Sequence, residues 1–329
     1  MGVGHVRRGY LYVTVAAVLF SVNASVSKVV LEAGVEPARL SALRCTGAAL
    51  GLGLVLLALA PRRLRFTVRE LPALALLGVA GAALVQWFYF VAIDRLPVGI
   101  ALLLEFTAPV LVALYARVVR REDVRGRTWL AIGLALAGLA LVAQVWRDTG
   151  LDPLGVAAGL GAAVCVATYF LVGGHTTATR DPASAAFYMF AFGALFWAAV
   201  QPWWSFDPAP LADAAPLLGA LDGFTLPGWV GIAWVIVLGT VVPYSLNLAA
   251  LQHVGPTAAG VAGMSEPVLA AAVAWAWLGQ SLAPLQVVGG LVVLAGIGLA
   301  QSAWSGRTDE ASVGAPYPAG VVAVGSPDR

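Results

Sequence analysis

The sequence predicts an all-α integral membrane protein whose ten transmembrane helices form two inverted five-helix repeats. Of the 329 residues, 60% are hydrophobic and only 11% are charged, which leaves too little polar surface for a soluble globule of this size. The bilayer core offers no water to unpaired backbone groups, so a spanning segment is a helix of about 20 apolar residues or a strand of a closed barrel. Long runs of Ala, Leu, Val and Gly without period-two alternation favour helices.

Ten apolar stretches separated by short connections define the predicted spans. They cover residues 10–31, 37–60, 71–93, 98–119, 127–146, 153–174, 183–204, 226–252, 256–278 and 284–303. Proline stands near most of the predicted starts, where the first helical amide lacks a partner in any case. Arg7 and Arg8 before the first stretch resemble the start of a signal peptide, but no clear small-x-small cleavage site follows, and we interpret it as an uncleaved span.

The positive residues predict that both termini are cytoplasmic. With that orientation the outer side carries only Lys28, Arg39, Arg95 and Arg147, and Arg44 lies within a span. The cytoplasmic side carries Arg7, Arg8, Arg62, Arg63, Arg65, Arg69, Arg117, Arg120, Arg121, Arg125, Arg127, Arg180, Arg307 and Arg329. This imbalance follows the positive-inside rule. We therefore expect a cytoplasmic segment at residues 1–9, repeats at 10–146 and 147–304, an acidic outer loop near 205–225 and a disordered cytoplasmic tail at 305–329.

An internal repeat indicates how the spans are related. A shift of 158 residues aligns spans 4 and 5 with spans 9 and 10 without a gap. The matched positions are Ala92 with Ala250, residues 109–111 with 267–269, Ala113 with Ala271, Ala137 with Ala295, Gly138 with Gly296 and Leu141 with Leu299. Because five spans, an odd number, separate the copies, the two halves should be inverted relative to each other. This architecture is typical of transporters that bind their substrate near the midplane.

The chain resembles the EamA-type transporters of the drug/metabolite transporter superfamily over about residues 9–304. The resemblance rests on residues 103–111 (LLEFTAPVL) and 264–269 (MSEPVL), on the polar stretch at 20–23 and on Arg44. The family's Glu-Pro pair is intact at Glu266 and Pro267 only, and Gln280 stands where the family often has an acid. The resemblance implies uptake or export of small metabolites, including amino acids, across the bacterial inner membrane.

Glu105 and Glu266 are the acidic residues that lie well inside predicted spans. A charged group there costs at least a few kcal/mol, so it usually faces a partner or a water-filled cavity. Glu266, about 15 Å from the inner edge of its span, would exchange a proton or meet a substrate amine, or else would simply fix the kink at Pro267. Glu105 has the further alternative of a structural ion pair with Arg44, which lies at a similar depth.

Pro109 and Pro267 each remove a helical hydrogen bond in mid-span. The freed carbonyls would bind a ligand or permit a hinge, unless neighbouring side chains satisfy them. Recurrence in both halves favours a role in gating. Trp87 and Tyr244 are the aromatic residues most expected to line a cavity, although such residues also face lipid. Asn23 and Asn247 would line it too, with interhelical hydrogen bonding as the alternative.

Other chemistries find no support in the sequence. Cys45 and Cys165 lie in apolar spans, and the three histidines form no metal or catalytic constellation. No phosphate-binding loop and no Ser-His-Asp order occur, so we expect no cofactor, metal, nucleic acid or hydrolysis-driven transport. Gly-x-x-x-Gly spacings indicate close helix contacts and leave a homodimer open.

These observations predict a secondary transporter, not an enzyme, that exports amino-acid-like or other small amphiphilic metabolites by alternating access. Its partners would be the lipid bilayer, a small-molecule substrate and, through Glu266, protons. Uptake or uncoupled facilitation is the alternative within transport. An intramembrane enzyme acting on lipid-linked substrates would need clustered polar groups at one interface, and a membrane scaffold would have a dry, filled centre.

Overall fold

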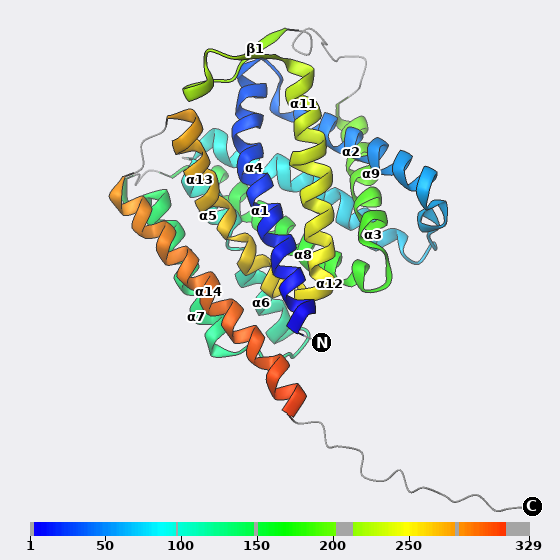
Figure 1. Cartoon of the computed structure of the whole chain (residues 1–329), viewed down its shortest axis with the longest axis vertical. Coiled ribbons are helices and arrows are strands. Elements are labelled where there is room, and N and C mark those ends of the chain that lie inside the picture. Colours follow the sequence, from blue (N-terminus) through cyan, green and yellow to red (C-terminus); the bar gives the residue numbers. More distant parts are fainter. Residues whose placement is uncertain (1–2, 97, 148–150, 202–212, 280–282, 314–329) are drawn as a thin grey trace, which may run out of the picture.

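The computed structural model describes residues 3–96, 98–147, 151–201, 213–279 and 283–313, and these form a bundle of helices (Figure 1). The helices are α1 Val3–Glu32, α2 Pro37–Leu59, α3 Leu71–Gly78, α4 Val85–Arg95, α5 Val98–Glu105, α6 Ala108–Val118, α7 Gly126–Ala143, α8 Pro153–Thr179, α9 Pro182–Val200, α11 Gly228–Ile236, α12 Val242–Gly263, α13 Ser265–Leu278 and α14 Pro284–Val313. Within the described residues, eight helical stretches are long and apolar enough to cross a membrane. Two shorter apolar helices, Ser265–Leu278 and Pro284–Ala300, accompany them.

Two features differ from the predicted all-helical chain with a disordered tail. A short antiparallel ribbon joins β1 Ala214–Pro216 to β2 Thr225–Pro227 in the predicted outer loop. Proline at the end of each strand holds the backbone extended there, which a search for apolar spans does not register. Helix α14 continues to Val313, because no proline interrupts it before Pro316, and thus includes the start of the segment expected to be disordered. Residues 314–329 of the predicted tail lie outside the described residues.

Wide helical turns interrupt two of the helical stretches at related positions. The π-helical segment η2, Val79–Leu84, joins α3 to α4, and the π-helical segment η6, Val237–Val241, joins α11 to α12. Their first residues are 158 positions apart, the shift that aligns the two sequence segments. A π-helical turn leaves the regular hydrogen-bond ladder and is often found at functional sites.

Predicted spans 4 and 9 are both broken near their middle. The first break separates α5 from α6 at Phe106 and Thr107, and the second separates α12 from α13 at Met264. The Thr107 hydroxyl donates to the Leu104 carbonyl at 2.6 Å, and the Ser265 hydroxyl, 158 positions later, donates to the Ala262 carbonyl at 2.8 Å. Side-chain hydroxyls therefore satisfy one carbonyl at each break; these are not the carbonyls of Glu105 and Gly263, which a mid-helix proline at 109 or 267 would free.

Pro109 and Pro267 lie in the first turns of the helices that follow the breaks, where proline is tolerated. A further boundary falls inside α12, between predicted spans 8 and 9. Gly255 has φ 76° and ψ 169° there, a conformation that a residue with a Cβ atom adopts only with strain, and Pro256 begins the next helical turn.

Glycine contacts hold α7 against α14. A Cβ atom at Gly138 would lie 2.6 Å from the carbonyl oxygen of Gly289, and one at Gly289 would lie 2.6 Å from that of Gly138. A Cβ at Gly296 would lie 2.8 Å from the carbonyl oxygen of Ala131. The main hydrophobic core joins α2, α8, α9 and α12, with Phe190 among its fully buried side chains.

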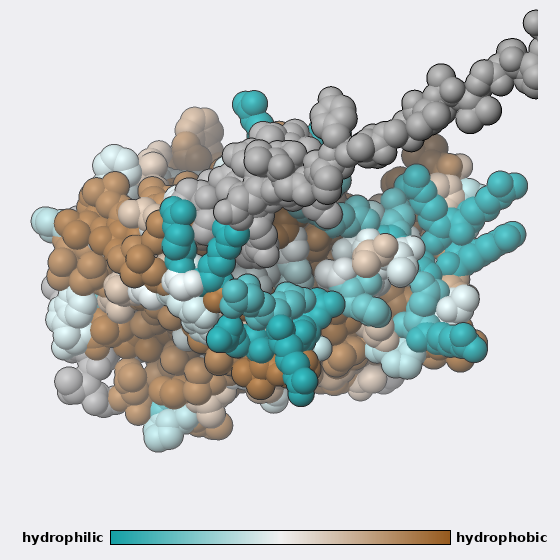
Figure 2. All heavy atoms as spheres, turned by 90° about the horizontal axis from the view of Figure 1, so that it is seen from below, coloured by the Kyte–Doolittle hydropathy of each residue, from teal (hydrophilic) through white to brown (hydrophobic). Residues whose placement is uncertain are grey.

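Charged side chains gather at the end of the bundle that carries the N-terminus and the end of α14 (Figures 1 and 2). Exposed arginines at residues 62, 63, 65 and 69 precede α3. Arg180, whose side chain is 7% exposed, donates to both carboxylate oxygens of Glu70 at 3.0 Å and to the carbonyls of Arg63 and Arg65. Its guanidinium also lies over the ring of Tyr188. This network ties the segment before α3 to the start of α9.

Candidate functional site

A cavity of about 330 Å³ lies inside the bundle and is lined by residues of α1, α2, η2, α4, α5, α6, α8, α12 and α13. Its lining combines an apolar wall with charged, amide and hydroxyl groups, as ligand sites commonly do. The polar lining residues are Asn23, Ser27, Lys28, Arg44, Gln86, Tyr89, Glu105, Tyr169, Tyr244, Asn247 and Glu266. The dry, filled centre expected of a scaffold is therefore absent from the described part of the chain.

The cavity brings together residues that are far apart in the sequence. Of the predicted site residues, those that line it are Asn23, Arg44, Glu105, Pro109, Tyr244, Asn247, Glu266 and Pro267. Trp87 lies elsewhere, with its side chain 47% exposed. Its neighbours Tyr89 and Phe90 line the cavity instead, because consecutive residues of a helix point in different directions.

Arg44 is held at the cavity wall by three hydrogen bonds. Its Nε donates to the Thr240 hydroxyl at 3.0 Å, one Nη to Oε1 of Gln86 at 3.1 Å and the other Nη to the Gly239 carbonyl at 3.4 Å. Among the described residues no ion pair joins Arg44 to Glu105, the alternative considered from the sequence. The planar fork of donors is thus oriented by α4 and by the wide turn η6.

Sequence reasoning missed Gln86 and Thr240, the partners of Arg44. Both are polar residues inside apolar spans, and that rarity is the signal that would have found them. Thr240 was hard to single out because a threonine can satisfy its own helix, and here its hydroxyl does donate to the Val235 carbonyl at 2.7 Å.

Glu105 and Glu266 occupy the helix ends created by the two breaks. Glu105 is the last residue of α5, and Glu266 is the second residue of α13. Both side chains are partly accessible because they border the cavity. No described side chain donates a hydrogen bond to either carboxylate, so both can meet water, a proton or a cationic group from the cavity. The positive end of the α13 helix dipole also stabilises a negative charge on the Glu266 carboxylate.

Tyr244 stands at the centre of an aromatic group. Its ring meets Phe20 at 5.1 Å, Phe190 at 5.3 Å and Tyr169 at 5.8 Å between centroids, each in an edge-to-face arrangement. Such contacts fix the orientation of the ring. The Tyr169 hydroxyl and the Asn23 side-chain oxygen are buried without a hydrogen-bond partner in the described residues. Both residues line the cavity with other atoms, and the Asn23 oxygen itself faces Gly239.

The cavity extends toward the end of the bundle opposite the termini. Lys28 and Leu31 near the end of α1 and Leu40 near the start of α2 line it, and Lys28 is exposed. Toward the other end, α8 closes against α12. A Cβ atom at Gly173 would lie 3.0 Å from Leu248, and Gln252 donates to the Thr177 carbonyl at 2.6 Å.

The described residues contain no group of three His, Cys, Asp or Glu side chains arranged to hold a metal ion. The buried thiols Cys45 and Cys165 are both free. The groups that line the cavity are carboxylates, one guanidinium, the Lys28 ammonium, amides and aromatic rings, and these can recognise a small polar molecule.

Comparison with known proteins identifies the chain's relatives. A model described as the EamA-like transporter family matches residues 7–144 and 153–301. The threonine/homoserine exporter RhtA of Escherichia coli (strain K12) is 32% identical over 257 residues, covering 76% of this chain and 78% of the relative. The uncharacterized transporter YdfC of Bacillus subtilis (strain 168) is 26% identical over 70% of this chain and 71% of its own length. One solved crystal structure superposes with a TM-score of 0.71 at 18% identity, covering 91% of this chain and 98% of the other, a likeness of fold alone.

Proposed function

Since the chain belongs to the EamA-like transporter family, we propose that it exports amino acids or similar small amphiphilic metabolites by alternating access. It is a multi-pass membrane protein and a transporter, not an enzyme. The observation that carries the proposal is the central cavity, in which two carboxylates that accept no hydrogen bond from a described side chain share one space with the oriented guanidinium of Arg44.

The chemistry of the cavity suits a zwitterionic substrate. Glu105 and Glu266 would meet an ammonium group, and Arg44 or Lys28 would meet a carboxylate. A cavity of about 330 Å³ is in the usual range for small-molecule sites. The similarity to threonine/homoserine exporters directs the proposal to amino acids with short polar side chains.

We propose further that the chain has ten spans in two inverted halves. Paired contacts support this arrangement, because a two-fold relation requires that a contact in one place recurs with exchanged partners. The 158-residue shift relates predicted spans 3, 4 and 5 to spans 8, 9 and 10, and a shift of 146 residues relates α1 to α8 and α2 to α9. The pairs are Gly9–Val254 with Gly155–Leu96, Asn23–Gly239 with Tyr169–Gly81, Gly47–Ile236 with Gly193–Gly78, and Gly138–Gly289 with Gly296–Ala131.

The same relation predicts the gate that would close in the opposite state. By these two shifts, Gly173 and Leu248, which are in contact, correspond to Ser27 and Phe90, which line the open cavity. In the state open toward the termini, Ser27 and Phe90 would come together while α8 and α12 separate. The proposed orientation, with both termini in the cytoplasm of a bacterial inner membrane, makes the present state outward-open. The exposed arginines at the terminal end support that orientation.

Cysteine cross-linking tests the gate. The pair Ser27→Cys and Phe90→Cys should cross-link during transport, when Cβ atoms approach to about 4 Å, and the pair Thr177→Cys and Gln252→Cys should cross-link when the cavity is open as seen here. Each cross-link should stop transport, and reduction should restore it. Transport that continues with either cross-link in place would exclude alternating access between these gates.

Export itself is tested by comparing metabolites inside and outside cells that express the wild type, Glu266→Gln or an empty vector, at matched membrane levels. A small amino acid depleted inside and enriched outside only with the wild type supports export and a role for Glu266. Identical profiles in all three strains would reject the proposal.

Proton coupling rests on Glu266 and is tested in proteoliposomes. An imposed pH gradient should accelerate wild-type transport of the exported amino acid, and Glu266→Gln should transport at a rate that the gradient does not change. If the wild type ignores the gradient, uncoupled facilitation is the mechanism. If the gradient drives accumulation only toward the side of the termini, the direction is uptake.

A further inference from the structure

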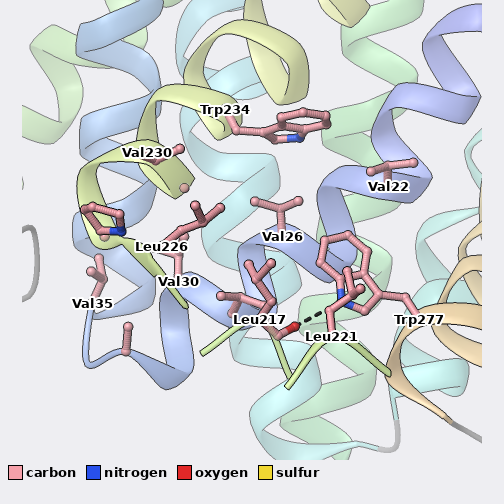
Figure 3. Close-up of a pocket in the computed structure, with 15 residues that line it drawn as sticks. Val22, Val26, Val30, Val35, Leu217, Leu221, Leu226, Val230, Trp234 and Trp277 are labelled. Atoms are coloured by element: carbon pink, nitrogen blue, oxygen red, sulfur yellow. Dashed lines mark hydrogen bonds between the residues drawn. The ribbon is translucent and has the colours of Figure 1, made fainter. Parts of the chain in front are cut away.

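A second cavity, of about 180 Å³, lies at the end of the bundle opposite the termini, between α1 and α11 and against the ribbon of β1 and β2 (Figures 1 and 3). Aliphatic side chains form its walls, among them Val26 and Val30 of α1 and Leu217 beside β1. The Trp277 indole N–H donates to the Leu217 carbonyl at 3.0 Å (dashed line in Figure 3). The indole N–H therefore already has a hydrogen-bond partner. Apolar cavities of about 150 Å³ can stay dry and hold an apolar guest.

This cavity continues a surface of α1 that faces outward. Leu11, Val15 and Val18 follow each other at helical spacing and are 58%, 40% and 45% exposed. Val22 and Val26 continue the same face of α1 and line the cavity. In a membrane-spanning bundle, exposed aliphatic side chains of this kind face lipid acyl chains. Among the described residues, this cavity and the central one share no lining residue.

The ribbon above the cavity exposes apolar and acidic side chains together. Leu221, Phe224 and Leu226 are 38%, 64% and 40% exposed, and Asp213 and Asp222 are exposed beside them. The sequence has no Lys or Arg between Arg180 and Arg307. The neighbouring ends of α1 and α2 add Lys28 and Arg39 but also the exposed Glu32 and Glu36. Together with Asp213 and Asp222 the carboxylates outnumber the cations here, which favours a headgroup with an ammonium over a net anionic one.

We infer that the cavity binds an acyl chain of a zwitterionic, ammonium-bearing phospholipid such as phosphatidylethanolamine, from the leaflet opposite the termini. The chain enters between α1 and α11, along the lipid-facing side of α1. The headgroup ammonium lies beside the ribbon carboxylates. The lipid thus joins the ribbon to the two helices that it covers.

The probe is phosphatidylethanolamine with a diazirine near the end of one acyl chain, in nanodiscs that hold the full chain. After photolysis, peptides that contain residues 22–35 and 228–234 should carry the label. Val26→Trp, which fills the cavity, should reduce that labelling by about ten-fold or more, as loss of a few buried methylenes predicts. Leu130→Trp, at an exposed position of α7 away from α1 and α11, should leave it unchanged.

A second filling variant protects the test against a folding defect. At Gly231 a Cβ atom would lie 2.8 Å from Val30 Cγ2, so Gly231→Val narrows the cavity from α11. It should also reduce the labelling while the melting temperature stays near that of Leu130→Trp. Labelling that is equal in the wild type and in both filling variants would overturn the site. So would displacement of the label by a transported amino acid, since the cavity would then belong to the transport pathway.

Competition between unlabelled lipids tests the headgroup. Phosphatidylethanolamine should compete with the probe better than phosphatidylglycerol, and the double variant Asp213→Asn with Asp222→Asn should abolish that preference. Equal competition by both lipids in the wild type would overturn the assignment of an ammonium-bearing headgroup.

Discussion

Arg44 donates a hydrogen bond to Oε1 of Gln86 at 3.1 Å, and the positions related to these two in the proposed second half hold Phe190 and Tyr244, whose rings meet at 5.3 Å. The same contact position is thus occupied by a polar pair in one proposed half and by an aromatic pair in the other. Arg44, Gln86 and Tyr244 of these four residues line the central cavity, so a guanidinium and an aromatic ring face the same space.

Replacement of Arg44 by Lys should reduce export strongly while the protein still reaches the membrane. A single ammonium cannot reproduce the three oriented donors that reach Thr240, Gln86 and the Gly239 carbonyl. Loss of one oriented charged hydrogen bond costs about 1.5 to 3 kcal/mol, or about ten-fold or more in rate. Uptake of the labelled amino acid identified by the export comparison into inside-out vesicles measures the effect, with exposed Arg117→Lys as the control. Equal rates would remove Arg44 from the pathway.

Alanine at two glycines of α7 should change stability in opposite directions. Gly133→Ala adds a methyl group where there is open space, and should stabilise the helix by up to about 1 kcal/mol. Gly138→Ala would place its methyl group 2.6 Å from the Gly289 carbonyl oxygen and should cost about 1 to 3 kcal/mol. Thermal unfolding of the purified protein distinguishes the two, and a shift of the same sign in both would contradict the close approach of α7 and α14.

The Arg180–Glu70 pair should contribute measurably to stability. Arg180 is 7% exposed and Glu70 34%, so breaking the pair should cost about 2 kcal/mol, below the roughly 3 to 5 kcal/mol of a fully buried pair. A double-mutant cycle with Arg180→Met and Glu70→Gln measures the coupling. The exposed pair Arg117–Asp123, with side chains 55% and 90% exposed, is the control and should show less than about 0.5 kcal/mol.

Glu70 should also make the protein less stable in acid. The Thr67 backbone N–H and then Arg180 hold the pKa of Glu70 below its usual value. A lowered folded-state pKa means that the carboxylate stabilises the fold fully above the unfolded-state pKa, about 4.3, and that this contribution is lost as the pH falls through the folded-state value. The melting temperature of Glu70→Gln should therefore fall less than that of the wild type between pH 7 and pH 3. Parallel curves would exclude the effect.

The sequence was informative where a pattern extends over many residues. Apolar stretches located most helix starts within a few residues. The shift of 158 residues also relates the two wide turns, which the sequence did not predict, and the two mid-span breaks, which precede Pro109 and Pro267. Membrane-buried charges are rare, so Arg44, Glu105 and Glu266 were recognisable as site candidates, and the structure places them at one cavity.

What the sequence did not predict depends on helix rotation and on contacts between distant segments. Trp87 and Tyr89 are two positions apart, and only the tertiary structure decides which of them faces the cavity. The sequence also suggested Glu105 as the partner of Arg44, because depth in the membrane was the only available criterion. Depth does not determine which helix stands beside Arg44, and in the structure α4 and η6 do.

The wide turns η2 and η6 determine the angular position of the side chains that follow them in α4 and α12. A π-helical turn holds one residue more than an α-helical turn, so the helix beyond it is rotated by about 100° relative to an uninterrupted α-helix. Gln86 follows η2 by two residues and Tyr244 follows η6 by three. Deleting a single residue from either turn would therefore leave an ordinary α-helix on which Gln86 or Tyr244 keeps its angular position, whereas inserting one more residue would turn that side chain about 100° away from the cavity wall.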